Sequence, residues 1–378
     1  MTRKPRIAVI GAGLGGCTMA ALLARADCTV RVYEQAPGFS RLGAGIHLGP
    51  NLMQVMAKID LQQKLTSIGS RPDFWYSRDG ITGEVMARIP LAGYAETHYG
   101  APYLTIHRGD FHQALCDAVP DGVIRFGARL MRTVDDGRSV RLEFADGTIE
   151  EADIVIGADG VNSVIRSALL GEELPQHSGY AAHRAVFRTP AQPALPFDMC
   201  TKWWADDRHL MVYYVSARRD EIYYVSGVPG GEDWSLERSF TPSSPDEVRS
   251  FFGDWHPTVQ ALIDASTEVT FWPLLERAPL PLWSRGRMVL LGDACHPMKP
   301  HMGQGAAMAI EDAGMLWRCF DELGFSDPEA VFRLYECNRT ERTSRVQSTS
   351  QANTWLRTNE NPDWCFGYDV FKVPLVNA

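Results

Sequence analysis

The stretch RIAVIGAGLGGCTMAALLARADCTVRVYEQ, from Arg6 to Gln35, decides the fold of this chain. Its apolar run 7–10 is typical of a parallel strand buried under helices on both faces. The glycines that follow open a helical segment rich in alanine and leucine, and a second strand, 29–33, ends on Glu34. An acidic residue at about this distance past the glycines is what a dinucleotide-binding βαβ unit requires. The stretch therefore predicts a site for an adenine dinucleotide.

Each glycine of the G-x-G-x-x-G pattern has a physical role in such a site. Gly11 permits a tight turn, Gly13 lets the backbone approach a pyrophosphate, and Gly16 lets the helix pack close to the strand. The pyrophosphate would sit at the helix N-terminus, where free N–H groups and the macrodipole favour an anion. Glu34 would accept hydrogen bonds from ribose hydroxyl groups. Without its context the pattern is often only a tight turn, but here the strand, the helix and the acid are all in place.

Length, composition and charge indicate a globular enzyme with two cores. The chain has 378 residues, more than the usual single domain, and its 45% hydrophobic and 22% charged residues are ordinary for a soluble protein. The net charge of −9, without a basic stripe, argues against nucleic acid. No apolar run is long enough to span a bilayer, and the start MTRKPR lacks the apolar core of a secretion signal. We therefore expect neither a membrane nor a nucleic-acid partner.

The cysteines indicate a reduced, cytoplasmic compartment. They contain no C-x-x-C pair and no zinc spacing, so we expect no metal site. The eight cysteines are Cys17, Cys28, Cys116, Cys200, Cys295, Cys319, Cys337 and Cys365.

A strand-rich pattern begins near residue 180 and continues to about 272. The run KWWADDRHLMVYYVSARRDEIYYVSGVP (202–229) reads as two antiparallel strands. Alternation places His209 and Tyr213 on one face of the first strand, as the wall of a shared pocket would need. Tyrosines such as Tyr223 are equally explained as ordinary cross-strand pairs, so their role stays open at this point.

A third informative stretch, RMVLLGDACHPMKPHMGQGAAMAIEDAGMLWRCF (287–320), is again a strand, a loop with glycines and a long helix. The dinucleotide-binding region is therefore discontinuous, with the strand-rich segment inserted into it.

We interpret His296, in a loop bracketed by prolines, as structural. His47 lies among the glycines of 43–49 and is either bonded to backbone or a titratable group that faces a ligand.

Three motifs occur in order along the chain: the first glycine pattern, D-G-x-x-S-x-x-R at 159–166, and G-D at 292–293 followed by P-x-x-G-x-G at 300–305. Together they resemble the flavin-dependent aromatic hydroxylases of the para-hydroxybenzoate hydroxylase fold, which are single-component class A monooxygenases. The resemblance implies an α/β protein. Its Rossmann-like FAD-binding domain, discontinuous in sequence, would carry an inserted, mainly antiparallel β-sheet substrate domain and be followed by C-terminal helices. The implied boundaries are 1–71, 103–179 and 276–320 for the FAD-binding domain, 72–102 and 180–275 for the substrate domain, and 321–378 for the C-terminal helical segment.

The resemblance implies bound FAD, with NADH and O₂ as co-substrates. No second G-x-G-x-x-G is present for a resident nicotinamide cofactor, so NADH would visit, reduce the flavin and leave. The helix that begins near Gly305 would point its N-terminus at the pyrimidine edge of the flavin. The positive end of the helix dipole would stabilise the anionic reduced flavin there.

The resemblance also assigns side chains to the cofactor. Arg41 and Arg108 would contact FAD phosphates or ribityl oxygens, and Asp293 would bind the ribityl chain. Glu34 would hold the adenosine ribose, and the Asp159 motif would serve FAD and the passing nicotinamide. The implied cofactor-binding residues are Gly11, Gly13, Gly16, Glu34, Arg41, Arg108, Asp159, Asp293, Gly303 and Gly305.

Within the family, stretches such as RLGAGIHLGPN (41–51), RPDFWYSRDG (71–80) and ANTWL (352–356) are most similar to hydroxylases of 6-hydroxynicotinate. This implies oxygenation through a C4a-hydroperoxyflavin at the ring carbon that bears the carboxylate, with loss of CO₂ and formation of 2,5-dihydroxypyridine. By the resemblance, His47 and Tyr213 handle protons, and a histidine suits the task because general bases work best near ambient pH. The other residues expected to line the substrate site are His209, His301, Cys200 and Tyr223.

Other functions remain open from the sequence. A related ring hydroxylase of salicylate or of another hydroxypyridine carboxylate would differ only in its pocket residues. An NAD-dependent dehydrogenase would use the first motif alone, and a non-catalytic flavoprotein would bind FAD without turnover. In the main interpretation the partner is a small anionic aromatic substrate, and the protein is a monomer or a homodimer.

Overall fold

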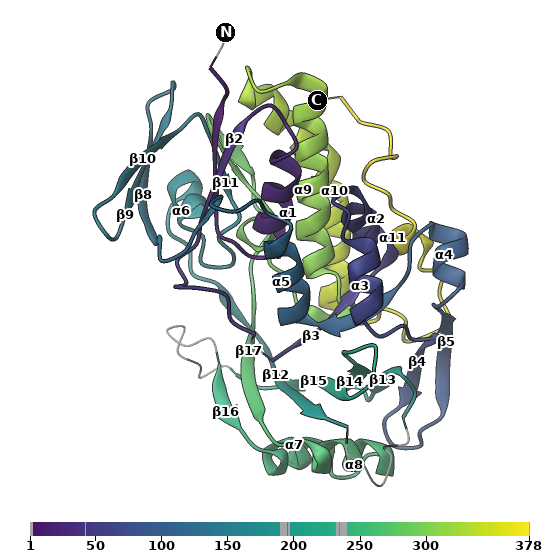
Figure 1. Cartoon of the computed structure of the whole chain (residues 1–378). Helices are drawn as coiled ribbons and strands as arrows, with labels where there is room; N and C mark the ends of the chain where they lie inside the picture. Colours follow the sequence, from purple (N-terminus) through teal and green to yellow (C-terminus); the bar gives the residue numbers. More distant parts are fainter. Residues whose placement is uncertain are drawn as a thin grey trace.

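The computed structural model describes residues 3–41, 43–189, 195, 197–231, 234 and 240–377. It is a mixed α/β fold with several sheets (Figure 1). Helices and a mainly parallel sheet form one part, and a large sheet with two helices beneath it forms the other. Within the described ranges, no helix combines the length and the apolar character that a membrane span needs.

The first sheet has six strands in the order β18-β19-β11-β1-β2-β7. All its pairs are parallel except β18 with β19. Its central strands are almost fully buried, as the apolar run 7–10 predicts. The strands are β1 (Arg6–Ile10), β2 (Thr29–Tyr33), β7 (Ile124–Arg125), β11 (Ile154–Gly157), β18 (Ser284–Arg285) and β19 (Met288–Leu290).

Long helices pack against this sheet and against one another. The helix α1 contacts α5 and α9, and α9 also contacts α10 (Figure 1). The first turn of α1 follows β1 directly, and the first turn of α9 follows the loop after β19, so both N-termini lie at the carboxyl ends of parallel strands. The helices are α1 (Leu14–Leu23), α2 (Pro50–Lys58), α3 (Gln62–Ile68), α4 (Tyr94–Tyr99), α5 (Arg108–Asp117), α6 (Val164–Leu170), α9 (Gly305–Leu323), α10 (Pro328–Ala352) and α11 (Asp363–Phe366).

The largest sheet has eight strands in the order β16-β17-β12-β15-β14-β13-β4-β5. All neighbours are antiparallel except β13 and β4. Its outer face packs on α7 (Pro245–Phe252) and α8 (Pro257–Ala265), which form a separate apolar core with it (Figure 1). The strands are β4 (Phe74–Asp79), β5 (Val85–Pro90), β12 (Gln176–Arg188), β13 (Cys200–Trp204), β14 (His209–Tyr214), β15 (Glu221–Pro229), β16 (Thr241–Ser243) and β17 (Val269–Glu276).

The register of this sheet decides which side chains share its inner face. Lys202 pairs with Met211, which pairs with Val225, which pairs with Arg184. Directly opposite residues in antiparallel strands point to the same face, so these four form one row. The neighbouring row contains Cys200, Tyr213 and Tyr223.

Two smaller sheets complete the fold. The antiparallel pair of β3 (Gly45–Leu48) and β6 (Leu104–His107) carries His47. A three-stranded sheet lies at one side of the molecule (Figure 1). The strands of the latter are β8 (Leu130–Asp135), β9 (Val140–Phe144) and β10 (Ile149–Ala152).

The mixed α/β class predicted from the sequence is confirmed. The strands of the large sheet come from 74–90 and 176–276, close to the segments predicted for an inserted domain. Because several residues of its inner face belong to the same apolar core as the six-stranded sheet, the division into two domains remains a proposal.

Candidate active site

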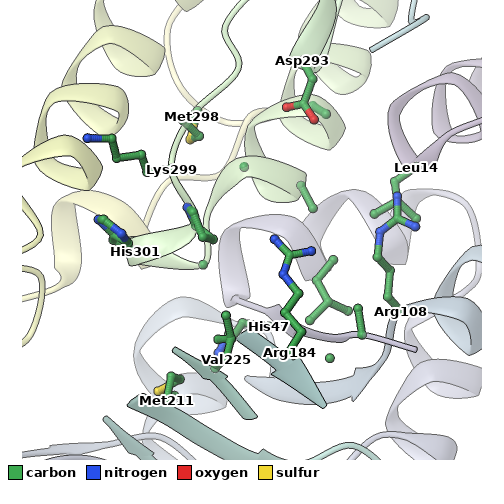
Figure 2. Close-up of a pocket in the computed structure, with 18 of the residues that line it drawn as sticks. Leu14, His47, Arg108, Arg184, Met211, Val225, Asp293, Met298, Lys299 and His301 are labelled. Carbon is green, nitrogen blue, oxygen red and sulfur yellow. The ribbon is translucent and has the colours of Figure 1, made fainter. Parts of the chain in front are cut away.

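A cavity of about 360 Å³ lies where the N-termini of α1 and α9 meet the inner face of the eight-stranded sheet. Figure 2 shows Asp293 and Arg108 on the helical side of this space, and His47 and Met211 on the side of the sheet. The cavity brings together these predicted residues: Gly13, His47, Arg108, His209, Tyr213, Tyr223, Asp293, His301, Gly303 and Gly305.

The glycine turn at the start of α1 has the geometry that its sequence predicts. Gly11 has φ +98°, and a Cβ there would lie 2.5 Å from the carbonyl oxygen of Ala158. A Cβ on Gly16 would lie 2.0 Å from the carbonyl oxygen of Gly11. A Cβ on Gly13 would meet nothing within 4 Å, and this residue lines the cavity. The turn therefore leaves open space in front of the first N–H groups of α1, where an anion is favoured.

Glu34 stabilises this turn through a hydrogen bond to its backbone. Its carboxylate accepts hydrogen bonds from the backbone N–H of Ala12 and of Ala36, both over 2.8 Å. The side chain is half-buried at the end of β2. The predicted contact with a ribose stays a prediction.

Asp293 and Arg108 face the cavity with their charged groups. Asp293 lies in a short 3₁₀ helix (Gly292–Ala294), and no hydrogen bond of its carboxylate is found among the described residues. The carboxylate is open to the cavity but enclosed by protein, and this desolvation raises its pKa although the charges of His296 and Arg108 oppose the shift. Arg108 begins α5, and burial lowers its pKa. Both groups are placed to bind a polar ligand.

Five predicted cofactor residues lie outside the lining of the cavity: Gly11, Gly16 and Glu34, described above, and Asp159 and Arg41. The carboxylate of Asp159 accepts hydrogen bonds from the Ser163 hydroxyl (2.6 Å) and the Val164 N–H (2.7 Å), so it stabilises the first turn of α6. Arg41 is paired with Asp110 (2.7 Å) and with Glu221 (3.0 Å) near the surface. Their direct contacts with a cofactor stay predictions.

His47 lies at the end of the cavity away from Asp293 and Arg108 (Figure 2). It projects from β3, its side chain is buried, and its Nδ1 lies 2.8 Å from the hydroxyl oxygen of Tyr103. Its ring packs against that of Tyr213, with centroids 4.2 Å apart. Burial, helped by the charge of Lys202, lowers the pKa of His47 to about 3, so the imidazole is neutral at neutral pH. For the Tyr213 phenol, burial raises the pKa, so it keeps its proton.

His209 and His301 meet edge to face, with ring centroids 5.0 Å apart. Nδ1 of His209 lies 3.2 Å from the amide nitrogen of Asn353, and Nδ1 of His301 lies 3.0 Å from the carbonyl oxygen of Ser350. Burial, followed by the charge of Lys202, lowers the pKa of both, to about 3 for His301. The Nε2 atom of His301 is buried without a hydrogen-bond partner among the described residues, so it is available to a ligand.

Tyr223 lines the cavity as expected, and Cys200 does not. Cys200 is fully buried in the row of Tyr213, and burial raises the pKa of its thiol. A neutral thiol in this position packs beneath the cavity wall, and its role as a substrate contact stays a prediction.

The residues that sequence reasoning missed are two basic side chains and their partners. Lys202 is 2% exposed, and its Nζ donates to the carbonyl oxygen of His301 (3.1 Å) and to Oδ1 of Asn353 (2.9 Å). Burial lowers the pKa of Lys202 well below its usual value. Figure 2 shows Arg184 reaching into the cavity. Its guanidinium carbon lies 4.6 Å from the centroid of the Trp272 ring. The prediction of two antiparallel strands in 202–229 is wrong, because this run contributes to three strands, β13, β14 and β15. The extra strand brings Lys202 opposite Met211. Arg184 joins the same row through the pairing of β12 with β15, which the sequence did not predict.

The donor set fits FAD. Two glycine-rich turns present helix N-termini to the cavity, which suits phosphates and the polar edge of a flavin. Asp293 offers a carboxylate to hydroxyl groups, and Arg108 offers a cation to phosphate.

Comparisons with known proteins agree with this fit. A family model described as "FAD binding domain" matches residues 4–350. The chain is 66% identical to the 6-hydroxynicotinate 3-monooxygenase of Bordetella bronchiseptica, over 100% of this chain and 99% of that protein. It is 62% identical to the protein of that name from Pseudomonas fluorescens, over 100% and 98%. The crystal structure of Klebsiella pneumoniae HpxO complexed with FAD and uric acid has a TM-score of 0.82 at 26% identity, and covers 95% of this chain and 90% of that one. The chain therefore belongs to the FAD-binding domain family, among its FAD-dependent aromatic monooxygenases.

Proposed function

We propose that this enzyme hydroxylates 6-hydroxynicotinate with loss of CO₂, giving 2,5-dihydroxypyridine. NADH supplies two electrons and O₂ supplies the oxygen, of which one atom enters the ring and the other leaves as water. The high identity to two 6-hydroxynicotinate 3-monooxygenases over their full length supports this substrate. The single observation that carries the proposal is the cavity, which connects the glycine turn of α1 with His47, Tyr213, His209 and His301.

Bound FAD would supply the redox chemistry and the activation of O₂, which no side chain can provide. The turn at Gly13, the carboxylate of Asp293 and the cation of Arg108 would hold it. Since the structure places Gly305 at the first turn of α9, the N-terminus of that helix faces the same cavity. NADH is a transient co-substrate, and O₂ is the second.

The side chains manage the substrate proton. An electron-rich ring attacks an electrophilic oxygen more readily, so the substrate hydroxyl should lose its proton during the reaction. His47 is neutral at pH 7, and when its Nδ1–H donates to Tyr103, its Nε2 is left as a free acceptor. Tyr213 lies against the same imidazole and keeps its proton, so it can donate a hydrogen bond to the developing oxyanion.

Basic side chains on the inner face of the sheet would compensate for the charge of the substrate. Burial disfavours the charged form of Lys202, and a bound carboxylate would favour it. The chain has a net charge of −9, so an anionic substrate needs local positive groups. Arg184 and Lys202 line the same cavity, and the buried Nε of Arg184 has no hydrogen-bond partner among the described residues. We assign these two residues to the carboxylate end of the substrate, with Tyr223 alongside.

The test is aerobic NADH oxidation by the purified FAD-loaded enzyme, with 6-hydroxynicotinate and salicylate in parallel. We expect 6-hydroxynicotinate to stimulate NADH oxidation, with CO₂ released and 2,5-dihydroxypyridine identified by its mass. Stimulation by salicylate alone would keep the enzyme class and overturn the substrate. FAD that NADH cannot reduce with either compound present would overturn the monooxygenase mechanism itself.

A further inference from the structure

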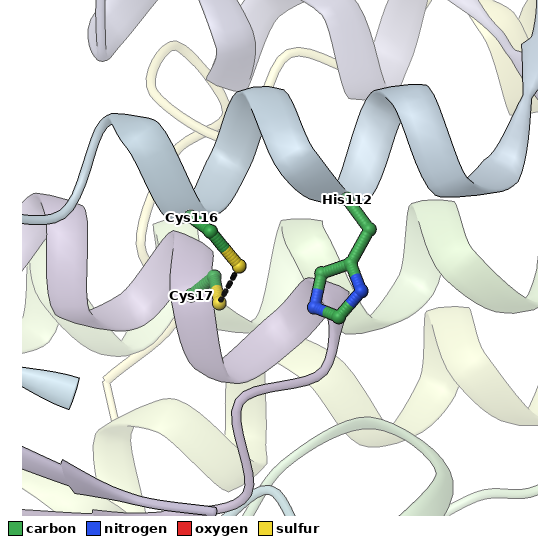
Figure 3. A group of neighbouring side chains, drawn as sticks. All are labelled: Cys17, His112 and Cys116. Atoms are coloured by element: carbon green, nitrogen blue, oxygen red, sulfur yellow. Dashed lines mark hydrogen bonds between the residues drawn. The ribbon is translucent and has the colours of Figure 1, made fainter. Parts of the chain in front are cut away.

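A cluster of metal-ligand side chains lies behind the glycine turn, outside the cavity. Cys17 projects from α1, and His112 and Cys116 project from one face of α5 (Figure 3). Their ligand atoms all lie within 4.8 Å of one another. Cys17 is buried, whereas His112 and Cys116 are half-buried. None of the three lines the cavity described above.

The cluster is built on a helical spacing. His112 and Cys116 are four residues apart, and residues at this spacing are neighbours on one helix face. Figure 3 shows the imidazole turned so that one of its nitrogens faces both sulfurs. The third side chain comes from α1, which packs on α5. The helix α1 therefore supplies one ligand group, and α5 supplies a chelating pair.

Distances in the cluster match a tetrahedral ion. The sulfurs of Cys17 and Cys116 are 3.6 Å apart. Two thiolates about 2.3 Å from a tetrahedral Zn²⁺ are about 3.8 Å apart. The carbonyl oxygen of Ala12 accepts hydrogen bonds from Sγ of Cys17 (3.2 Å) and from Nε2 of His112 (2.5 Å), and an ion at the cluster would replace these bonds. Two sulfurs and one imidazole nitrogen therefore lie within reach of one ion.

The chemistry of the three side chains also suits a cation. Cysteine and histidine are typical ligands of zinc in proteins. A metal binds the thiolate form of cysteine and the neutral form of histidine, so the cation would displace the protons of these groups.

We propose that Cys17, His112 and Cys116 form a binding site for a thiophilic divalent cation, Zn²⁺, with water as the fourth ligand. The cation would join α1 to α5 directly behind the turn between Gly11 and Gly13. Short-range sequence spacing gave no sign of this site, because Cys17 and Cys116 are 99 residues apart and only the packing of α1 on α5 joins them.

The test uses the full-length, FAD-loaded enzyme, reduced, freed of metal and kept anaerobic. Zn²⁺ affinity is measured by competition with a chromophoric chelator, and stoichiometry by mass spectrometry of the metal. We expect one tightly bound Zn²⁺ per chain. Cys116→Ser and His112→Gln should each weaken binding by more than the roughly 10–100-fold typical of substitutions outside the ligand shell. Cys337→Ser is the matched control, because Cys337 is an exposed cysteine elsewhere, and it should bind Zn²⁺ as the parent does.

Cys17 is fully buried, so its substitution could disturb folding. Its role as a metal ligand is therefore tested by NMR of bound cadmium. ¹¹³Cd²⁺ in place of Zn²⁺ should give one NMR resonance in the range of sites with two thiolates, and Cys116→Ser should move it to the one-thiolate range. Unchanged Zn²⁺ affinity in both ligand variants would overturn the proposal. So would a parent enzyme that binds no Zn²⁺ and instead forms a Cys17–Cys116 disulfide in air, which would make the contact a redox pair.

Discussion

The Nδ1 atom of His47 lies 2.8 Å from the hydroxyl oxygen of Tyr103, and both groups are buried. His47 comes from β3, and Tyr103 immediately precedes β6, the strand that pairs with β3. A fixed partner on Nδ1 decides which nitrogen of an imidazole carries its proton. The pairing of these two strands therefore orients the imidazole that we assign to proton transfer.

Replacing Tyr103 with Phe should slow turnover while the enzyme keeps FAD. Without the hydroxyl, the imidazole of His47 loses its partner and can adopt either tautomer. We expect kcat with 6-hydroxynicotinate to fall about 10-fold, which corresponds to one net hydrogen bond of about 1.4 kcal/mol. Tyr99→Phe is the control, because its hydroxyl bonds Asp363 near the surface. Equal kcat in the two variants would remove Tyr103 from the mechanism.

His47→Gln and Tyr213→Phe should impair the reaction more strongly than Tyr103→Phe. Each removes a group that we place against the substrate, and a general acid or base contributes about 10²–10⁴-fold. Steady-state NADH oxidation, stimulated by substrate, measures the loss, and the absorbance of bound flavin measures cofactor content. A variant that loses FAD, and recovers full kcat when FAD is added back, would show that its residue serves the cofactor instead.

Asp293→Ala should weaken FAD binding with little effect on the fold. The carboxylate faces the cavity and makes no hydrogen bond to another described residue, so its removal leaves no protein donor unpaired. Loss of a charged hydrogen bond of 1.5–3 kcal/mol predicts a Kd for FAD that is about 10–100-fold higher. Quenching of flavin fluorescence on titration gives the Kd. An unchanged value would contradict the cofactor role.

The glycine turn was predictable because its chemistry is local. The conformation of Gly11 and the close approach of Gly16 to the strand follow from the spacing of a few residues. Alternation likewise placed His209 and Tyr213 on one strand face, which the structure confirms. Such features depend on residues that are close in the sequence, so they can be predicted from the sequence alone.

The features that needed the structure depend on contacts between distant segments. Lys202 meets Asn353, 151 residues away, through a helix end that sequence patterns do not position. Arg184 enters the cavity because β12 lies beside β15, a pairing that alternation cannot reveal. Arg41 depends on distant segments too, since folding pairs it with Asp110 and Glu221, and its contact with the cofactor stays a prediction.

Buried neutral histidines should make the enzyme less stable in mild acid. His47 and His301 have folded-state pKa values of about 3, below the value of about 6.5 expected in the unfolded chain. The unfolded state therefore binds more protons between these values, and stability falls as pH drops through about 6.5. Each histidine should cost about 2 kcal/mol of unfolding free energy between pH 7 and pH 5.

Urea unfolding of the parent and of His301→Gln at pH 7 and pH 5, with FAD at one concentration, measures this effect. The variant should lose about 2 kcal/mol less than the parent over that pH step, because it lacks one of the titrating groups. Carboxylates contribute little in this window, since their unfolded pKa values lie near 4. Identical pH dependence in the two proteins would mean that His301 is not buried neutral.

A buried ionic network holds the helix that faces the cavity. Arg339 of α10 donates to Glu311 and to Asp312 of α9, both over 2.7 Å, and all three side chains are fully buried. Asp312 also contacts His296 at 2.5 Å, which agrees with the structural role expected for that histidine. Removing one partner of a buried pair leaves an uncompensated charge, which costs about 3–5 kcal/mol.

Arg339→Met should therefore lower the unfolding free energy by about 3–5 kcal/mol and weaken FAD retention, because α9 begins at the cavity. Arg333→Ala is the matched control on the same helix. Its guanidinium is 60% exposed and pairs with Glu329 at 3.8 Å, so the loss should be below about 1 kcal/mol. Urea unfolding and flavin release on heating measure the two effects. Equal stability of Arg339→Met and Arg333→Ala would contradict this prediction. The remaining partners, His296 and Arg342, would then suffice for the two carboxylates, and the position of α9 would not depend on Arg339.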